Sequence, residues 1–386
     1  MKLYLHIGTP KTGTTSIQRF LKTKRDELLA NDIYLPDTLT FGKSNNHRKL
    51  PFMVTSIERR LGDFEQYVRQ GLVDEEVMKA AKVEFRKIFE EEIDSNKSFG
   101  SCIITSEHAS ARLNDIEELN RLNQLLYGFF DEIEIIVYLR RQVDFAVSAY
   151  STSIKTGQAL KELKSLEVYN RKINYFDTLT NWKQAFPNAK FHVRLFDGKE
   201  LVEGDVVKDF CRIVGFSPEE EYHDIPANES LDILGLELLR RVNDRLSWNA
   251  GDKVNPLRTT IDQFFVKHLS EGPRKKPTAE ETEEFEKYFF ESNEKVRQEY
   301  FPDRDVLFPK AKISPSVRSD FDERELEALA NMLADIWVQR AELTIQNKKQ
   351  TIENTKLLKE LNLIKNRKPR LSFLARMKRS IRKRLP

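Results

Sequence analysis

The stretch Leu-His-Ile-Gly-Thr-Pro-Lys-Thr-Gly-Thr-Thr-Ser-Ile-Gln, at positions 5–18, decides the fold of this chain. The apolar residues that come before the first glycine predict a short buried strand. The segment from Gly8 to Gly13 predicts a turn, and the periodic apolar residues after Thr14 predict a helix. A glycine-bearing turn between a strand and a helix directs backbone N–H groups and the positive end of the helix dipole at one point. This arrangement is typical of a phosphate-binding loop.

The loop departs from the phosphate loop of nucleotide triphosphatases in the place of its lysine. Their pattern is G-x-x-x-x-G-K-[ST], in which a lysine follows the second glycine. Gly8 and Gly13 keep this spacing, but Thr14 stands at the lysine position. The lysine of this loop is Lys11, between the two glycines. Such a loop suits a ligand whose key charge lies on an oxygen that bridges two small anionic groups. The alternative is a tight strand–helix turn that binds no ligand.

The loop Gly8-Thr9-Pro10-Lys11-Thr12-Gly13-Thr14-Thr15 resembles the 5′-phosphosulfate loop of sulfotransferases, in particular of their bacterial branch. Those enzymes take a sulfuryl group from 3′-phosphoadenosine-5′-phosphosulfate (PAPS). The resemblance implies that the backbone N–H groups of the loop hold the 5′-phosphosulfate together with the hydroxyls of Thr12, Thr14 and Thr15. It also implies that Lys11 stabilises the charge that develops on the bridging oxygen as the sulfuryl group leaves.

A second motif matches the part of these enzymes that binds the 3′-phosphate of the donor. Residues 134–140 form a nearly continuous apolar run that predicts a buried parallel strand ending at Arg140. Sulfotransferases place an arginine at the end of such a strand and a serine eight residues later, and Ser148 has this spacing. The guanidinium of arginine can bind two phosphate oxygens at once and stays charged at any working pH. For Arg140 taken alone, the alternative is a solvated strand end.

Glu107 and His108 follow a third predicted strand, over residues 101–105. In open parallel sheets, ligands bind outside the carboxyl ends of the strands, where the loop 8–15 also lies. Sulfuryl transfer needs a base that takes the proton of the acceptor hydroxyl, and sulfotransferases use a glutamate or a histidine for this step. The resemblance therefore implies Glu107 as the base and His108 as the second candidate. The alternatives are a glutamate that only caps the next helix and a histidine that orients or supports the site.

The order of predicted elements indicates the fold class. Predicted strands alternate with helical patterns, which favours an α/β fold: a P-loop-type parallel β-sheet flanked by helices, with a C-terminal helical extension that could form a coiled coil. These strands lie near residues 2–7, 101–105, 134–140 and 190–196. We expect three parts: a sulfotransferase domain over residues 1–310, a long helix over 320–365 and a basic amphipathic tail over 366–386. The resemblance covers roughly the first of these parts.

Two stretches of the first part are harder to interpret. The interval 40–100 is too long for a simple crossover, so we expect it to build part of the acceptor cleft. Within it, His47 and Arg48 are interpreted as residues of an ordinary exposed loop, with contact to an anionic acceptor as the alternative. The animal cytosolic enzymes carry a late segment G-x-x-G-D-W-K that closes on the donor, and it is missing here. Asn228 and Ser230 stand near its place without an assigned contact, so the adenine-binding residues stay unassigned.

A heptad pattern begins after about Phe321. The intervening positions of this frame include Asn347 and Asn354, and asparagine at one heptad phase can set the register of a two-stranded coil. The pattern predicts a homodimer through residues 326–364, with a helix packed on the catalytic domain as the alternative. The apolar positions of the frame are Leu326, Leu329, Leu333, Ile336, Leu343, Leu357, Leu361 and Ile364, and Arg340 and Gln350 are the other polar ones.

The tail over residues 366–386 is rich in lysine and arginine and has no acidic residue, although the whole chain has a net charge of only +3. As a helix it would carry one apolar stripe surrounded by basic residues, namely Leu374, Met377, Ile381 and Leu385. This pattern is typical of a helix that lies on an anionic membrane surface. Nucleic-acid binding is disfavoured, because no nucleic-acid-binding module accompanies the tail. The alternative is a solvated, disordered tail.

Composition excludes several other classes of protein. No run of 18 apolar residues is long enough for a transmembrane helix, and no signal peptide is expected because the strand–loop motif begins at Lys2. Cys102 and Cys211 are expected to be packing residues. The six histidines lack metal-ligand spacing, so no metal site is expected. We expect a cytoplasmic protein that is peripheral at the inner face of the cell membrane.

Together these patterns predict a sulfotransferase that moves a sulfuryl group from PAPS to a hydroxyl of a glycan or glycolipid acceptor, without a metal. One alternative is a P-loop nucleotide-dependent kinase, which is disfavoured by Thr14 and by the lack of an evident acid to hold magnesium. Another is a non-catalytic, nucleotide-binding membrane scaffold. The presence of both Lys11 and Glu107 argues against the scaffold.

Overall fold

The centre of the fold is an all-parallel β-sheet of five strands in the order β2-β3-β1-β4-β5. This confirms the predicted α/β class with a parallel sheet flanked by helices, and four of the strands lie where the sequence predicts them. The sequence does not predict β2, because two residues cannot show a period. The strands are β1 (Lys2–Gly8), β2 (Ile33–Tyr34), β3 (Ser101–Thr105), β4 (Glu132–Leu139) and β5 (Lys190–Leu195).

The structure is a computed structural model, and it describes residues 1–42, 44–57, 72, 74–219, 230–250, 253–258, 260–310 and 322–366. The predicted basic tail lies outside these residues apart from Asn366, and so does Asn228. No helix of the described residues is both long and apolar enough to cross a membrane.

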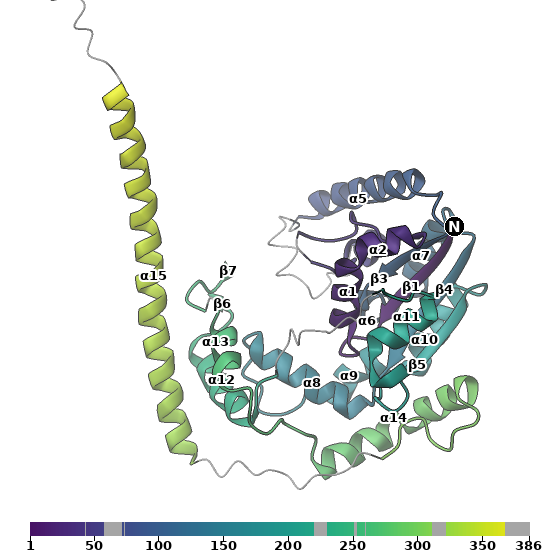
Figure 1. Ribbon diagram of the computed structural model, residues 1–386. Coiled ribbons are helices and arrows are strands. Elements are labelled where there is room, and N and C mark those ends of the chain that lie inside the picture. Colours follow the sequence, from purple (N-terminus) through teal and green to yellow (C-terminus); the bar gives the residue numbers. More distant parts are fainter. Residues whose placement is uncertain are drawn as a thin grey trace, which may run out of the picture.

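Helices cover both faces of the sheet (Figure 1). Side chains alternate between the two faces along each strand, so Leu3 and Leu5 face one core and Tyr4 faces the other. The smaller core lies under α1 (Thr14–Thr23), α2 (Arg25–Ala30) and α11 (Val206–Val214). The larger core lies under α3 (Lys49–Val54), α5 (Glu75–Ser95), α6 (Glu107–Arg112), α7 (Ile116–Tyr127), α8 (Gln142–Lys155), α9 (Leu166–Ile173), α10 (Tyr175–Ala185) and α14 (Ala279–Tyr300).

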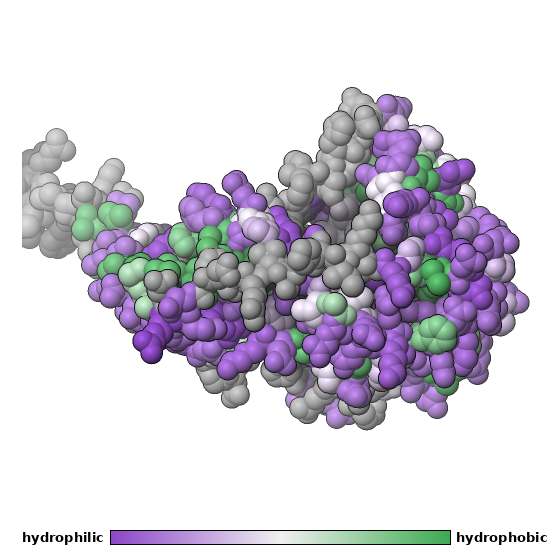
Figure 2. Space-filling model, turned by 90° about the horizontal axis from the view of Figure 1, so that it is seen from below, coloured by the Kyte–Doolittle hydropathy of each residue, from purple (hydrophilic) through white to green (hydrophobic). Residues whose placement is uncertain are grey.

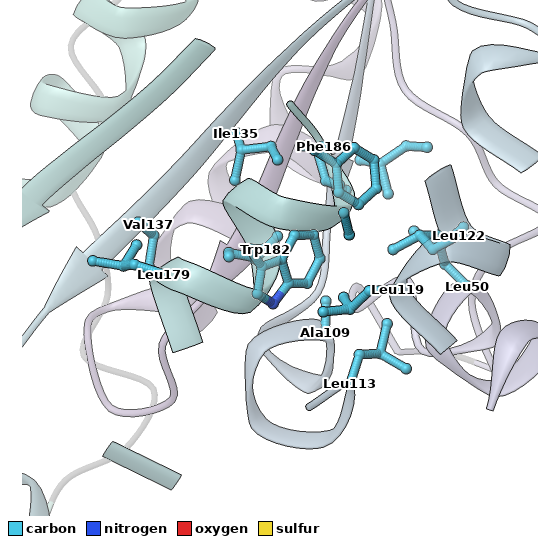
Figure 3. Packing of buried hydrophobic residues seen from close by; sticks show 14 of the residues in the cluster. Leu50, Ala109, Leu113, Leu119, Leu122, Ile135, Val137, Leu179, Trp182 and Phe186 are labelled. Carbon is cyan, nitrogen blue, oxygen red and sulfur yellow. The ribbon is translucent and has the colours of Figure 1, made fainter. Parts of the chain in front are cut away.

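Aromatic side chains of α10 hold the larger core together. Trp182 is fully buried, and its ring stacks on Phe186 with the ring centroids 5.4 Å apart. Figure 3 shows both rings between Ile135 of β4 and Leu119 of α7. Buried aromatic pairs of this kind add to the stabilisation that comes from burying their apolar area. The core therefore fixes the position of β4, at whose carboxyl end Arg140 lies.

A further helical layer packs against the second half of α8. It consists of α12 (Ile233–Arg245), α13 (Ile261–His268) and the first turns of the long helix α15 (Glu323–Asn366). Trp337 of α15 is buried there and donates a hydrogen bond from its indole N–H to the Leu257 carbonyl at 2.9 Å. A short antiparallel pair, β6 (Asn249–Ala250) and β7 (Lys253–Val254), lies between α12 and α13 in the chain. The first half of α15 thus packs on the rest of the fold, which is the alternative that the sequence left open.

The buried stripe of α15 is not the predicted heptad frame. Leu326 is buried, but Leu329, Ile336 and Leu343 of the same frame are exposed. Leu333 of the frame is partly buried against the body, but the other fully buried residues lie outside the frame, namely Ala330, Ala334, Trp337 and Ala341. From Thr351 to Leu363 every side chain of the helix is exposed, and Figure 1 shows this half extending away from the body. Self-association through the exposed residues stays a prediction.

The surface of the molecule is mostly hydrophilic on the face seen in Figure 2. Apolar side chains form small patches on this face, one of them at the end of the molecule where α15 lies. Leu329 and Met332 of α15 are among the exposed large apolar side chains.

Candidate active site

The phosphate-binding loop begins at the carboxyl end of the central strand. β1 pairs with β3 on one side and with β4 on the other, and the chain visits the β3 side first and the β4 side afterwards. The end of β1 is therefore the point at which the strand order reverses, and ligands of open α/β sheets bind at such a point. Gly13 is the N-cap of α1, so the loop leads directly into the positive end of that helix.

Both glycines of the loop are required by their surroundings. Gly8 has a φ of 101° and Gly13 a φ of 75°, which L side chains rarely adopt. A Cβ atom on Gly8 would lie 2.9 Å from the Cα and the Cβ of Glu107. A Cβ atom on Gly13 would lie 2.7 Å from the Cγ1 of Val206 in α11. The absence of a side chain at Gly8 thus lets the loop approach the candidate base closely.

The threonines of the loop occupy different environments. Thr9 donates hydrogen bonds from its backbone N–H and its hydroxyl to the carbonyl of Tyr138, at 3.2 and 2.9 Å. The hydroxyl of Thr12 donates to the carbonyl of Thr9 and is buried. Thr14 is buried at the start of α1, whereas Thr15 is exposed. The first two threonines therefore brace the loop from within, and the two that follow Gly13 lie at the N-terminus of the helix.

Lys11 is held against α8. Its ammonium group donates a hydrogen bond to the hydroxyl of Thr152, and that hydroxyl donates in turn to the carbonyl of Ser148 at 3.1 Å. Burial lowers the pKa of Lys11 to about 8, helped by the positive charges of Lys155 and Arg140, while the charge of Glu107 acts in the opposite direction. A lysine in this state is still mostly charged at neutral pH, and no carboxylate of the described residues is in hydrogen-bond contact with it. It is therefore ready to bind an anion.

Arg140 and Ser148 line one pocket, and their binding of a 3′-phosphate, which the resemblance implies, stays a prediction. The guanidinium of Arg140 donates to the carbonyl of Lys11 at 2.8 Å, so it also ties the end of β4 to the phosphate loop. The hydroxyl of Tyr175 donates to the carbonyl of Arg140 at 2.6 Å and fixes its backbone. The pocket has a volume of about 360 Å³.

Three further basic residues and two serines line the same pocket, and sequence reasoning does not assign them to it. They are Arg274, Lys275, Lys276, Ser151 and Ser230. Ser151 and Ser230 share a hydrogen bond of 3.3 Å between their hydroxyls. The signal in the sequence is the basic run between Pro273 and Pro277, but such a run is most often a solvated loop. Asp144 also lines the pocket, and its carboxylate forms an ion pair with Arg141 at 3.1 Å. The four cations, Arg140 and residues 274–276, outnumber this carboxylate and fit a phosphate group with two negative charges.

Glu107 is the first residue of α6 and is held by two amides. Gln18 of α1 donates to its Oε2 atom at 2.7 Å, and Asn46 donates to the same oxygen. The other carboxylate oxygen, Oε1, has no hydrogen-bond partner among the described residues. Asn46 is fixed in turn by the hydroxyl of Ser106, which donates to its side-chain carbonyl at 2.9 Å. The carboxylate is thus oriented through one oxygen and can accept a proton at the other.

His47 contradicts its interpretation as a residue of an exposed loop, and Arg48 is half-buried. The side chains of Asn46 and His47 are buried, with 3% and 2% of their surface exposed. The backbone N–H of Thr105 donates to the Nδ1 atom of His47 at 3.1 Å, and the N–H of His47 donates to the carbonyl of Thr105 at 3.0 Å. The segment docks against the end of β3, and this contact brings Asn46 to Glu107. Asn46 thus brings the interval 40–100 into contact with Glu107, and a role of this interval in the acceptor cleft stays a prediction.

His108 is poorly suited to act as the base. The Nε atom of Arg112 donates to its Nδ1 atom at 2.7 Å. Burial and the charges of Arg112 and Arg48 lower the pKa of His108 to about 2, so the ring is neutral at physiological pH. In a neutral ring whose Nδ1 accepts a hydrogen bond, the proton is on Nε2. Neither nitrogen then offers a lone pair to an acceptor hydroxyl, and the geometry favours Glu107.

The other histidines and the cysteines near the sheet are structural. His6 is fully buried and shares a hydrogen bond of 2.9 Å between its Nδ1 atom and the hydroxyl of Thr105. Cys102 and Cys211 are free and buried, as expected for packing residues. No three side chains of His, Cys, Asp or Glu gather at one point in the described ranges.

Comparison with known proteins finds a relative by sequence and similar chains by structure. No protein-family model matches the chain. An uncharacterized protein of Archaeoglobus fulgidus is 35% identical to it over 205 residues, and this match covers 52% of the chain and 54% of that protein, so the chain matches only about half of its curated relative. The chain is similar in structure to two sulfotransferases.

The two structural matches cover about three quarters of the chain at low identity. A sulfotransferase from Alicyclobacillus acidocaldarius matches with a TM-score of 0.39 and 15% identity, over 76% of this chain and 94% of that one. A sulfotransferase domain from the curacin biosynthetic pathway matches with a TM-score of 0.31 and 12% identity, over 75% of this chain and 96% of that one.

Proposed function

We propose that this protein is a PAPS-dependent sulfotransferase that transfers a sulfuryl group to a hydroxyl of a glycan or glycolipid. One observation carries the proposal: a phosphate loop, a basic pocket and an oriented carboxylate meet at the carboxyl edge of the sheet. Arg140 contacts the loop through the Lys11 carbonyl, and the loop contacts the base through Gly8 and Glu107. A donor with two separate phosphate groups and one transferable group matches these three features.

The residues divide the binding of the donor between them. The pocket of Arg140 and Ser148, with Lys275 and Lys276, would hold the 3′-phosphate, because it combines cations with hydroxyl donors. The N–H groups at the start of α1 and the hydroxyls of Thr14 and Thr15 would hold the 5′-phosphosulfate. The hydroxyl of Thr12, which the resemblance also assigns to this group, is buried and donates to the Thr9 carbonyl instead. The distinction from a P-loop kinase is the place of the lysine: Lys11 approaches from within the loop.

In the chemical step, Glu107 accepts the acceptor's hydroxyl proton at Oε1 while the hydroxyl oxygen forms its bond to sulfur. The bond between sulfur and the bridging oxygen breaks, and its electron pair stays on that oxygen, which belongs to 3′-phosphoadenosine-5′-phosphate (PAP). Lys11 stabilises this developing negative charge, which is greater in the transition state than in the bound donor. A positioned general base contributes about 10²–10⁴-fold to such a reaction.

The test of the donor assignment is binding of PAP and of 5′-AMP, measured by calorimetry. PAP should bind far more tightly, because only PAP has a phosphate for Arg140 and Ser148 to contact. Equal affinities would contradict the assignment of the pocket, and a preference for magnesium-ATP would favour the kinase. Incubation of the protein with labelled PAPS and extracts of glycans and glycolipids would then identify the acceptor.

A further inference from the structure

One face of α8 presents a line of polar side chains to the site. Ser148, Ser151, Thr152 and Lys155 follow at intervals of three and four residues, so they lie on one side of the helix. Ser148 and Ser151 line the basic pocket, and Thr152 contacts the ammonium group of Lys11. Lys155 lies one turn further along, about 4.5 Å beyond Thr152 on the helix axis.

This line of residues runs parallel to the proposed course of the donor. The 3′-phosphate pocket lies at Ser148, and the bridging oxygen of the phosphosulfate would lie at Lys11, beside Thr152. Continuation in the same direction leads from the bridging oxygen to the sulfuryl group and then to the acceptor. Lys155 would therefore lie on the reacting side of a donor that is bound in this way.

The surroundings of Lys155 leave its ammonium group without a direct partner. It is partly buried, and it makes no hydrogen bond or ion pair with any residue that the structure describes. The charged groups that act on it are Asp262 of α13 and Arg274 of the basic pocket, and they act in opposite directions. Burial lowers its pKa, and its charge helps to lower the pKa of Lys11. Lys155 stands three residues after Thr152, the partner of Lys11, so both lysines lie along the same face of α8. Partly buried cations that share one face are costly unless an anion compensates them.

We propose that Lys155 and Lys11 together bind an oxyanion on the reacting side of the donor. The oxyanion is either the sulfuryl group of PAPS or an acidic substituent of the acceptor, since both would place negatively charged oxygens at this point. The inference rests on the proposed function, because it needs PAPS as the donor. It adds a binding residue that neither sequence motif contains.

A lysine in the last turn of a helix also interacts favourably with the helix dipole. That role stabilises the fold and is independent of any ligand. It predicts a change in thermal stability and no change in the relative affinities of two ligands. A comparison of ligands therefore separates the two roles.

The experiment compares Lys155→Met with Lys161→Met, which removes an exposed lysine beyond the end of α8. Calorimetry without acceptor measures the affinities for PAPS and for PAP, and titration of inorganic sulfate measures oxyanion binding to the PAP complex. If the sulfuryl group is the ligand, Lys155→Met lowers the affinity for PAPS about tenfold or more relative to PAP. If an acidic acceptor group is the ligand, the ratio is unchanged and sulfate binding to the PAP complex is lost.

If Lys155→Met leaves both the ratio of PAPS to PAP affinity and sulfate binding to the PAP complex unchanged, the inference is overturned, whatever happens to thermal stability. A second readout is the pH dependence of PAPS binding. Because the charge of Lys155 lowers the pKa of Lys11, its removal should move the alkaline loss of PAPS binding to higher pH, and Lys161→Met should not. Failure of the proposed function itself is distinguishable, because the unmodified protein would then not prefer PAP to 5′-AMP.

Discussion

The site has two sides, one lined by α8 (the α8 side) and one formed around Glu107 of α6 (the α6 side), and they differ in how their charges are compensated. On the α8 side, Arg140 and the basic run 274–276 line one pocket with a single carboxylate, that of Asp144, and the charges of Arg140 and Lys155 act on Lys11. On the α6 side, Glu107 has two amide donors that are themselves held in place. The first side has an excess of positive charge that a bound anion would compensate, whereas the second is ordered by hydrogen bonds within the protein. Binding and proton transfer should therefore be separable by mutation.

The largest expected effect is on turnover, from the α6 side. Glu107→Gln should lower kcat by about 10²–10⁴-fold, the usual contribution of a general base. The affinity for PAP should hardly change, because the glutamine carbonyl can still accept from Gln18 and Asn46. On one preparation, steady-state kinetics measures kcat and calorimetry measures the affinity for PAP. A fully active Glu107→Gln with an inactive His108→Ala would reverse the roles of the two residues.

Lys11→Met should lower kcat by about 10²–10³-fold, because one preorganised charge at the leaving oxygen is lost. Its effect on the affinity for PAP should be smaller, since PAP already has several contacts in the basic pocket. Thr152→Val is the matched control, because it removes the partner of Lys11 and keeps the charge. An equal loss of kcat and PAP affinity in Lys11→Met would assign this lysine to ground-state binding.

Arg140→Ala should weaken PAP about 10–100-fold, which corresponds to about 1.5–3 kcal/mol for hydrogen bonds to a charged group. Binding of 5′-AMP should change much less, because it has no 3′-phosphate. Arg140→Lys keeps the charge and loses the forked geometry, so its affinity for PAP should lie between those of the unmodified protein and of Arg140→Ala. A similar loss for PAP and 5′-AMP would mean that Arg140 acts only by holding the loop through the Lys11 carbonyl.

The smallest expected effect is on pH dependence. The pKa of Lys11 is lowered to about 8, and only its charged form attracts the donor. Binding of PAPS should therefore be full at neutral pH and fall, by about tenfold or less, as the pH rises through 8. Calorimetry at a series of pH values measures this fall. If PAPS binding falls with pH in the same way in Lys11→Met, another titrating group causes the fall.

The α8 side could be predicted from the sequence to a larger extent than the α6 side. Glycine spacing and an arginine after an apolar strand are local signals, and they predict that the loop and Arg140 lie at one edge of the sheet. Gln18 and Asn46 reach Glu107 only because separate segments dock beside it. A buried polar network of this kind has no period in the sequence. For Lys155, the spacing from Ser148 is visible, but the proximity to Lys11 is a product of folding.

For the long helix α15, too, the sequence alone does not predict which residues are buried. A heptad scan counts leucine and isoleucine, and it therefore selects residues such as Leu329 and Ile336, which are exposed. The stripe that packs on the body uses Ala330 and Ala334, whose small side chains let α12 approach closely, together with Trp337. Which stripe is buried depends on the shape of the neighbouring helices.

The free half of α15 has a consequence for the motion of the whole molecule. The roughly 25 residues after Ala341 form a rod about 38 Å long at 1.5 Å per residue, and nearly all of its side chains are in solvent. Such a rod adds little mass but much friction. The protein should sediment more slowly than a sphere of equal mass, and its fluorescence anisotropy should decay with more than one rotational correlation time.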